Sequence, residues 1–320
     1  MKGVGNFDCR VMVYCSLTAL MAFRVSSGRA VRGARTIPRL SRRISVGALI
    51  GGIALPLMLM LPGHWACRAA EKPSELMFEG GVTGYLAPSE VPNSLVILPP
   101  PPKPDSSAFA RDAEVAQHTA LLRDTPRWGQ AALDADLRFP EAAAAFTCAV
   151  DVPITERATP ALLRILRRSM VDAVLSTYAA KDGYKRLRPF MINGQTTCTP
   201  GDEERLRGKG SYPSGHSSIG WTWALILAEL VPERSDLIME RGRSYGDSRL
   251  VCAVHWESDV IEGRTMGAAT FSRLQASSQF QADIKVARSE LHVARAKALA
   301  PTRDCDSERR ALGQSIPGVL

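Results

Sequence analysis

The chain has 320 residues, 45% of them hydrophobic and 22% charged, so it is long enough to bury a sizeable core. Its formal net charge of +8 comes from the N-terminal part: residues 1–69 carry ten Lys or Arg and one acidic residue, whereas residues 70–320 carry 30 basic and 31 acidic residues. This near-neutral body argues against a nucleic-acid-binding protein.

Residues 1–69 have the features of a leader that contains a secretory signal. A basic stretch including Arg42-Arg43 precedes sixteen uncharged residues, Val46–Leu61, and small residues follow up to Ala69. A basic, then an apolar, then a small-residue region is typical of a cleaved signal peptide, and sixteen residues interrupted by a proline are short for a membrane anchor. We therefore expect a periplasmic or secreted protein without stable membrane insertion, exported by either the Sec or the twin-arginine route.

Residues 70–107 form a second, proline-rich segment. They contain eight prolines, four of them consecutive at 99–102. Proline lacks the N–H that a helix interior needs and favours extended polyproline geometry. The sequence predicts an extended arm that packs across its own domain or remains loose, rather than one that binds a partner.

Residues 108–300 are predicted to form one all-α domain with a core helix bundle. Apolar residues recur every four positions from Leu162 to Tyr178, which is typical of an amphipathic helix, and no alternating strand pattern is present. Residues 301–320 are expected to be a loose tail. Helices are predicted over about 107–123, 160–183, 219–231, 233–246, 256–275 and 280–299.

Four of the seven cysteines follow the leader: Cys148, Cys198, Cys252 and Cys305. Export would permit disulfides, and four cysteines allow three complete pairings. Because Cys148 and Cys198 both lie in loop-like surroundings, we expect them to pair with each other. No C-x-x-C or His/Cys cluster has the spacing of a zinc site.

Three short motifs carry residues suited to phosphate chemistry. They are Lys181 followed by Arg188-Pro189, then Pro213-Ser214-Gly215-His216 before the buried helix, and finally Ser248-Arg249 followed by His255 and Asp259. Each alone has an ordinary structural explanation, such as a solvated cation at a helix end, a capping loop, or a surface His–Asp pair. Together they supply guanidinium forks and free helix-start amides, which both bind phosphoryl oxygens.

The third motif also carries a geometric expectation. Arg249 and His255 are six residues apart, and a straight helix would direct them about 120° away from each other. If both face one phosphate, the helix must break between them.

These motifs, in this order, resemble the three-part signature of the type-2 phosphatidic acid phosphatase and vanadium haloperoxidase superfamily. The string Gly210–His216, the Leu98-Pro99-Pro100 arm and Trp256–Asp259 are similar, more narrowly, to the bacterial class A non-specific acid phosphatases. The resemblance covers about residues 95–300 and implies an all-α fold with a helical bundle at its core.

The resemblance also implies a role for each motif residue. His255 is the expected nucleophile, Asp259 the acceptor that orients it, and His216 the general acid. The remaining residues are expected to bind the phosphate oxygens: Lys181, Arg188, Ser214, Gly215 and Arg249. The implied activity is metal-independent hydrolysis of phosphomonoesters through a phospho-histidine, without a cofactor, releasing inorganic phosphate and with phosphotransfer to alcohols as a side reaction.

Several alternatives follow from the same residues. A vanadium-dependent haloperoxidase would use the same oxyanion site, and a membrane lipid phosphatase would need several apolar spans of about 20 residues, which residues 70–320 do not contain. A phosphate-binding module would be distinguished by its lack of turnover. The substrate and the oligomeric state stay open: the small residues Gly263, Gly267 and Ala268 favour close helix packing, either within one chain or in a homo-oligomer.

Overall fold

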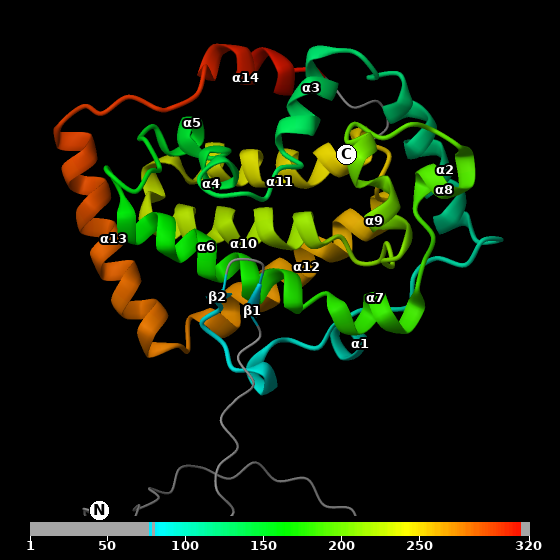
Figure 1. Ribbon diagram of the computed structural model, residues 1–320, viewed down its shortest axis with the longest axis horizontal. Helices are drawn as coiled ribbons and strands as arrows, with labels where there is room; N and C mark the ends of the chain where they lie inside the picture. The colour runs from blue at the N-terminus through cyan, green and yellow to red at the C-terminus, as the bar shows by residue number, and fades with distance from the viewer. Residues whose placement is uncertain (1–76, 79–80, 315–320) are drawn as a thin grey trace, which may run out of the picture. The chain divides into compact units, whose positions relative to one another are not determined.

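The computed structural model describes residues 77–78 and 81–314, so the predicted leader lies outside the described residues. Two short strands, β1 (Met77–Phe78) and β2 (Val82–Thr83), pair antiparallel, and all other regular elements in the described range are helices (Figure 1). The predicted all-α class is therefore confirmed. Among the described helices, none has the length and apolar character needed to cross a bilayer.

The helix α10 (Gly215–Leu230) lies in the middle of the bundle. The helices α6 (Pro160–Leu175), α11 (Ser235–Val251) and α12 (Glu257–Leu274) pack around it, and α13 (Ser278–Ala296) packs on α6 (Figure 1). Most of α10 is buried, as predicted from its apolar composition, and the fully buried Trp223 donates its indole N–H to the carbonyl of Leu166 at 2.9 Å.

Glycines let α11 and α12 approach α10 closely. A Cβ at Gly242 would lie 2.4 Å from the Cβ of Ala224, and one at Gly263 would lie 2.5 Å from the carbonyl oxygen of Ser214. Neither distance is tolerable for a larger residue, so these positions set the spacing of the bundle. The small-residue side of α12 therefore packs within the chain.

Shorter helices surround this centre. The helix α2 packs against α11 and α12, and α3 packs against α11. The predicted helix over 107–123 is thus confirmed as α2, with its end at Ala120. The bounds are α2 (Ser107–Ala120), α3 (Pro126–Leu133), α4 (Glu141–Ala144), α5 (Thr147–Val150), α8 (Pro189–Asn193), α9 (Glu203–Arg207), and the 3-10 helices η2 (Pro200–Asp202) and η3 (Pro232–Arg234).

The single helix predicted over 160–183 is wrong in its length. The structure has α6 and then a separate helix, α7 (Tyr178–Tyr184). The hydroxyls of Ser176 and Thr177 donate to the carbonyls of Ala173 and Val174 at 2.8 and 2.6 Å, and such local bonds compete with helix propagation. The break places Lys181 on its own short helix.

The proline-rich arm is less extended than predicted. It contains the 3-10 helix η1 (Pro88–Glu90) and the short helix α1 (Ser94–Ile97), which Asn93 caps by accepting from the N–H of Leu95. The helix η1 begins on Pro88, at the first position where a missing N–H costs no helical bond, and α1 lies between Pro92 and Pro99. The hydroxyl of Tyr212 donates to the carbonyl of Pro99 at 2.7 Å, so the arm packs on its own domain as expected.

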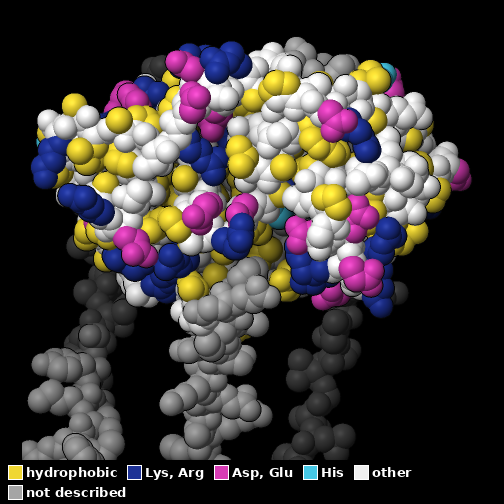
Figure 2. All heavy atoms as spheres, turned by 45° about the horizontal axis from the view of Figure 1, so that its top comes forward, with side chains coloured by type: hydrophobic (Ala, Val, Ile, Leu, Met, Phe, Trp, Pro, Cys, Tyr) yellow, Lys and Arg dark blue, Asp and Glu magenta, His cyan; other side chains and the backbone are white. Residues whose placement is uncertain are grey.

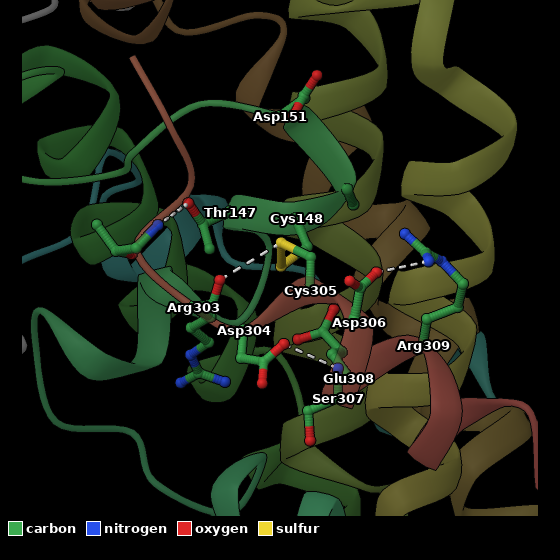
Figure 3. The surroundings of a disulfide bond; sticks show 12 residues. Thr147, Cys148, Asp151, Arg303, Asp304, Cys305, Asp306, Ser307, Glu308 and Arg309 are labelled. Atoms are coloured by element: carbon green, nitrogen blue, oxygen red, sulfur yellow. Dashed lines mark hydrogen bonds and ion pairs between the residues drawn. A yellow bond between two sulfur atoms is a disulfide. The ribbon is translucent and has the colours of Figure 1, made fainter.

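The C-terminal segment is not a loose tail over its described part, which corrects the prediction. It forms α14 (Cys305–Leu312), whose start is capped by the carboxylate of Asp304 (Figure 3). The buried Glu308 reaches the guanidinium of Arg241 on α11 at 3.3 Å. A cap, a buried ion pair and a disulfide therefore hold this helix against the domain.

The disulfide pairing also corrects the prediction. Cys148 on α5 is joined to Cys305 on α14, with their Cα atoms 5.5 Å apart (Figure 3), and Cys198 is joined to Cys252 with Cα atoms 4.7 Å apart. The expected Cys148–Cys198 bridge is wrong because it rested on local loop character, whereas pairing is decided by which loops the helices bring together.

On the face of the molecule drawn in Figure 2, charged side chains of both signs are intermixed, Lys and Arg with Asp and Glu. This agrees with the near-neutral balance of residues 70–320.

Candidate active site

The N-terminus of α10 carries Ser214 as its cap. The Ser214 Oγ accepts from the N–H of Ser217 at 3.3 Å, and the Ser214 N–H donates to the carbonyl of Asp259 at 2.8 Å. The Ser214 amide is thus already bonded, whereas its hydroxyl only accepts in these contacts and keeps a proton to donate, so phosphate binding by Ser214 stays a prediction for the side chain. Within the described part of the chain, the amides of Gly215 and His216 have no acceptor, and a helix start with free N–H groups favours an anion.

The predicted break between Arg249 and His255 is confirmed. The helix α11 ends at Val251, and Ala253 has a left-handed φ of 58°. The Arg249 carbonyl accepts from the N–H of Val254 at 3.2 Å, which closes the turn in a Schellman arrangement. Because the helix ends here, His255 lies beside the last turn of α11, where its N–H donates to the carbonyl of Arg249 at 3.3 Å. On a continuous helix the two side chains would point about 120° apart.

The buried His255 ring has a defined tautomer. Its Nδ1 lies 3.2 Å from Oδ2 of Asp259, and its Nε2 lies 3.2 Å from Nη1 of Arg188. An arginine can only donate, so Nε2 is the unprotonated nitrogen and Nδ1 carries the proton toward Asp259. Burial, and then the charges of Arg188 and Lys181, hold the pKa of His255 well below its usual value. The result is a neutral imidazole whose Nε2 lone pair accepts from Arg188.

Asp259 accepts hydrogen bonds on both carboxylate oxygens. Its Oδ2 accepts from the N–H of Trp256 at 2.9 Å and from the hydroxyl of Ser211 at 2.5 Å, in addition to facing His255. Its Oδ1 accepts from Nη1 of Arg186 at 2.7 Å. This fully buried carboxylate is therefore fixed in position from four directions.

Three buried cations surround His255, and none of them has a carboxylate partner among residues 81–314. Lys181 donates to the carbonyls of Gly210 and Ser211 at 3.1 and 3.2 Å, and Arg188 donates to carbonyls at 2.9–3.3 Å besides the histidine ring. The Nε of Arg249 has no hydrogen-bond partner among the described residues. Burial lowers the pKa of Lys181 to about 7 and those of Arg188 and Arg249 to about 10.

His216 belongs to the same cluster. Its half-buried ring stacks on Tyr245 with centroids 6.3 Å apart, and its Nε2 lies 3.1 Å from the carbonyl of Ala135. Since a carbonyl only accepts, Nε2 carries a proton and Nδ1 is left to exchange one. Burial, and then the charge of Arg249, lower the pKa of His216 well below its usual value.

Comparison with known proteins agrees with this arrangement. Residues 162–280 match the PAP2 superfamily. The chain is 42% identical over 207 residues to a non-specific acid phosphatase of Providencia stuartii, covering 64% of this chain and 84% of that protein. It is 40% identical over 212 residues to a non-specific acid phosphatase of Salmonella typhimurium, covering 66% and 85%, and 38% identical over 207 residues to an acid phosphatase of Zymomonas mobilis, covering 65% and 78%. The chain belongs to the class A non-specific acid phosphatases.

The residues of this acid phosphatase that hold Asp259 in place, Ser211, Arg186 and Asp112, were not predicted from the sequence. Ser211 and Arg186 lie inside or beside the motifs, but an Arg two residues before Arg188 has no distinguishing local pattern. Asp112 comes from α2, where it accepts from Nη2 of Arg186 at 2.6 Å. Nothing in its neighbourhood in the sequence indicates this contact, because it joins residues 74 positions apart.

One disulfide of the acid phosphatase adjoins the site. Cys252 lies in the turn between α11 and α12, and its Sγ is 3.7 Å from Nη1 of Arg249. Through Cys198 this turn is covalently attached to the loop before η2. The disulfide thus limits the movement of the segment that carries both Arg249 and His255.

Proposed function

We propose that this acid phosphatase hydrolyses phosphomonoesters through a covalent phosphate on Nε2 of His255, without a metal ion. The observation that supports this most strongly is the set of three buried cations, Lys181, Arg188 and Arg249, which have no carboxylate within 4 Å in the described structure. Buried charges are ordinarily paired, so such a set requires an anion. A phosphoryl group next to a neutral imidazole meets that requirement.

In the first step, the lone pair on Nε2 of His255 forms a bond to phosphorus while the bond from phosphorus to the ester oxygen breaks. The leaving alkoxide takes a proton from Nδ1 of His216. A bound phosphate dianion offsets the burial and the cationic neighbours that lower the pKa of His216, so the ring can enter this step protonated. Asp259 stabilises the charge that develops on the His255 ring.

In the second step, water attacks phosphorus, His216 takes its proton, and the P–N bond breaks to release inorganic phosphate. The three cations and the amides of Gly215 and His216 stabilise the equatorial oxygens, where the transition-state charge spreads. An alcohol in place of water gives a transferred phosphate. Since these groups contact only the phosphoryl part, we expect broad specificity for the ester group.

Metal independence follows from the same charge balance. Three cationic side chains supply the charge that a divalent ion would otherwise provide to the phosphoryl oxygens. The carboxylate of Asp259, whose charge acts on Lys181 and Arg188, has both oxygens occupied by hydrogen-bond donors. It is therefore poorly suited to ligate a metal.

Export to the periplasm or beyond is part of the proposal. The signal-like leader supports it, and so do the two disulfides formed by the four cysteines of the described region, since such bonds persist in oxidising compartments.

The test is quenching in alkaline detergent during turnover of a phosphate-labelled monoester in the presence of EDTA. We expect an alkali-stable, acid-labile label on the native chain and none on His255→Ala. The exposed His292 provides the matched control, because His292→Ala removes an imidazole far from the cluster in the sequence and should keep the full label.

Two outcomes would contradict the proposal. Normal turnover by His255→Ala, or activity lost in EDTA, would exclude the phospho-histidine or the metal-independent route. Peroxide-dependent oxidation of halide after addition of vanadate, without phosphatase turnover, would favour the haloperoxidase alternative instead.

A further inference from the structure

We propose that Arg186, held by Asp112, is a positioning residue that keeps the carboxylate of Asp259 oriented toward His255. This inference rests on the proposed function, because it assigns Arg186 an effect on the nucleophile and not on phosphate binding.

The guanidinium of Arg186 bridges two buried carboxylates. Its Nη1 donates to Oδ1 of Asp259 at 2.7 Å, and its Nη2 donates to Oδ2 of Asp112 at 2.6 Å, with only 8% of the Arg186 side chain exposed. The ring of Trp256 lies 5.4 Å from its central carbon. A planar fork with fixed donor directions makes both contacts at once, which a single ammonium group cannot reproduce.

Asp112 connects this bridge to the start of α12. It accepts from the N–H of Ser258 at 2.8 Å and from the Ser258 hydroxyl at 2.6 Å, so it fixes the first turn of the helix that carries Asp259. The Ser258 hydroxyl in turn accepts from Nη1 of Arg186 at 2.7 Å. One carboxylate from α2 therefore positions both the arginine and the helix.

The two carboxylate oxygens of Asp259 contact different partners. Arg186 bonds to Oδ1, and this leaves Oδ2 to face Nδ1 of His255. Without the Arg186 fork on Oδ1, only the donors on Oδ2, from Ser211 and Trp256, would hold the carboxylate, and it could turn away from the ring. The guanidinium prevents this without competing for Oδ2.

Asp112 also offsets the positive charge of Arg186, which would otherwise destabilise the phosphorylated His255 ring. If Arg186 were paired with Asp259 alone, its whole positive charge would act against the imidazolium that forms when His255 is phosphorylated. Shared between two carboxylates, the group Asp112–Arg186–Asp259 carries a net charge of about −1, counted from the ionised forms of its members. That negative charge stabilises the phosphorylated ring.

The first measurement is the rate of phosphoenzyme formation in Arg186→Met and Arg186→Lys, followed by rapid quenching in alkaline detergent. We expect both to be about 10- to 100-fold slower than the native enzyme, as for other residues that orient a reacting group through a second residue, with KM changed by less than about twofold. Arg111→Gln is the matched control: Arg111 also links α2 to α12, through Glu257 at 2.9 Å, but lies at the surface. This variant should keep the native rate.

The second measurement combines Arg186→Met with Asp259→Asn. If Arg186 acts through Asp259, the double variant is no slower than Asp259→Asn alone. Nitrogen-15 NMR of the His255 ring should show the Nδ1-protonated tautomer in the native enzyme and a mixture of tautomers in Arg186→Met, with near-UV circular dichroism confirming that each variant is folded.

A folded Arg186→Met enzyme with the native rate and tautomer, or a full additional loss in the double variant, would overturn this inference. In both cases the native enzyme would still form its phospho-histidine. Absence of label from the native enzyme would instead refute the proposed function.

Discussion

Two arginines on the same helix show how differently a buried cation can be used. Arg241 and Arg249 both lie on α11 and are both 3% exposed. Arg241 pairs with Asp134 at 2.5 Å and with Glu308 at 3.3 Å, and although burial alone lowers its pKa, these two carboxylates outweigh burial and raise it. Arg249 pairs with neither, and burial lowers its pKa to about 10.

This difference separates buried charges that stabilise the folded protein from buried charges that can bind a ligand. A cation that is satisfied within the protein contributes to folding and has nothing to offer a ligand. A cation without a carboxylate costs stability until an anion arrives. The same substitution at the two positions should therefore have opposite consequences.

The largest expected effect is on catalysis at Arg249. Arg249→Met should lower kcat/KM by about 10²- to 10³-fold, because it removes a donor to the transition-state oxygens. Urea unfolding of the phosphate-free variant should show stability equal to or higher than native. A clear loss of stability would mean that Arg249 has a structural partner after all.

Arg241→Met should do the reverse. It leaves Asp134 buried without its countercharge, so we expect a loss of about 3–5 kcal/mol in the free energy of unfolding. Activity per folded molecule, measured below the unfolding temperature, should change much less than in Arg249→Met. Equal losses of activity in both variants would erase the distinction.

The disulfides sharpen the comparison, because one adjoins Arg249 and the other does not. Replacing both cysteines of either bridge with serine should destabilise the protein by about 2–4 kcal/mol. The chain-entropy argument makes the loss about 1 kcal/mol larger for Cys148–Cys305, which spans 157 residues against 54 for Cys198–Cys252. Only loss of Cys198–Cys252 should raise KM, because it frees the turn that carries Arg249. A KM that rises on loss of Cys148–Cys305 but not on loss of Cys198–Cys252 would contradict this.

The smallest expected effect is on the pH dependence of stability through Lys181. Burial lowers its pKa from 10.5 to about 7 in the folded, empty protein. Between these values the unfolded chain binds more protons at Lys181 than the folded chain does, so this residue makes stability rise as the pH rises from about 7 to 10.

Melting temperatures of the native protein and Lys181→Met over this range, with and without phosphate, test the sign. The difference between the two proteins should shrink as the pH rises without phosphate, and bound phosphate, which keeps Lys181 protonated, should remove that trend. A difference that grows with pH in the empty protein would refute the assignment.

Local patterns predicted the parts of this molecule that depend on nearby residues. The buried helix α10 follows from its apolar run, and the break after Val251 follows from the rotation between Arg249 and His255. The end of α6 at Leu175 was missed because two hydroxyls, at Ser176 and Thr177, override a continuous apolar stripe.

The remaining features depend on contacts between distant segments, which local patterns do not encode. Asp112 reaches Arg186 across 74 residues, and Cys148 reaches Cys305 across 157. A free rather than paired state for Arg249 likewise depends on where Asp134 and Glu308 lie. The motifs indicated which residues meet a phosphate, whereas the layer that orients them required the structure.

The bridge between Cys148 and Cys305 has a consequence for proteolysis. Every motif residue from Lys181 to Asp259 lies between these two cysteines, so they belong to one covalently closed ring. A protease that cuts once within that ring, for example in the loop around Gly208 that follows α9, opens the chain without releasing either piece. The nicked enzyme keeps its two histidines on a single molecule, and only reduction would separate the fragments.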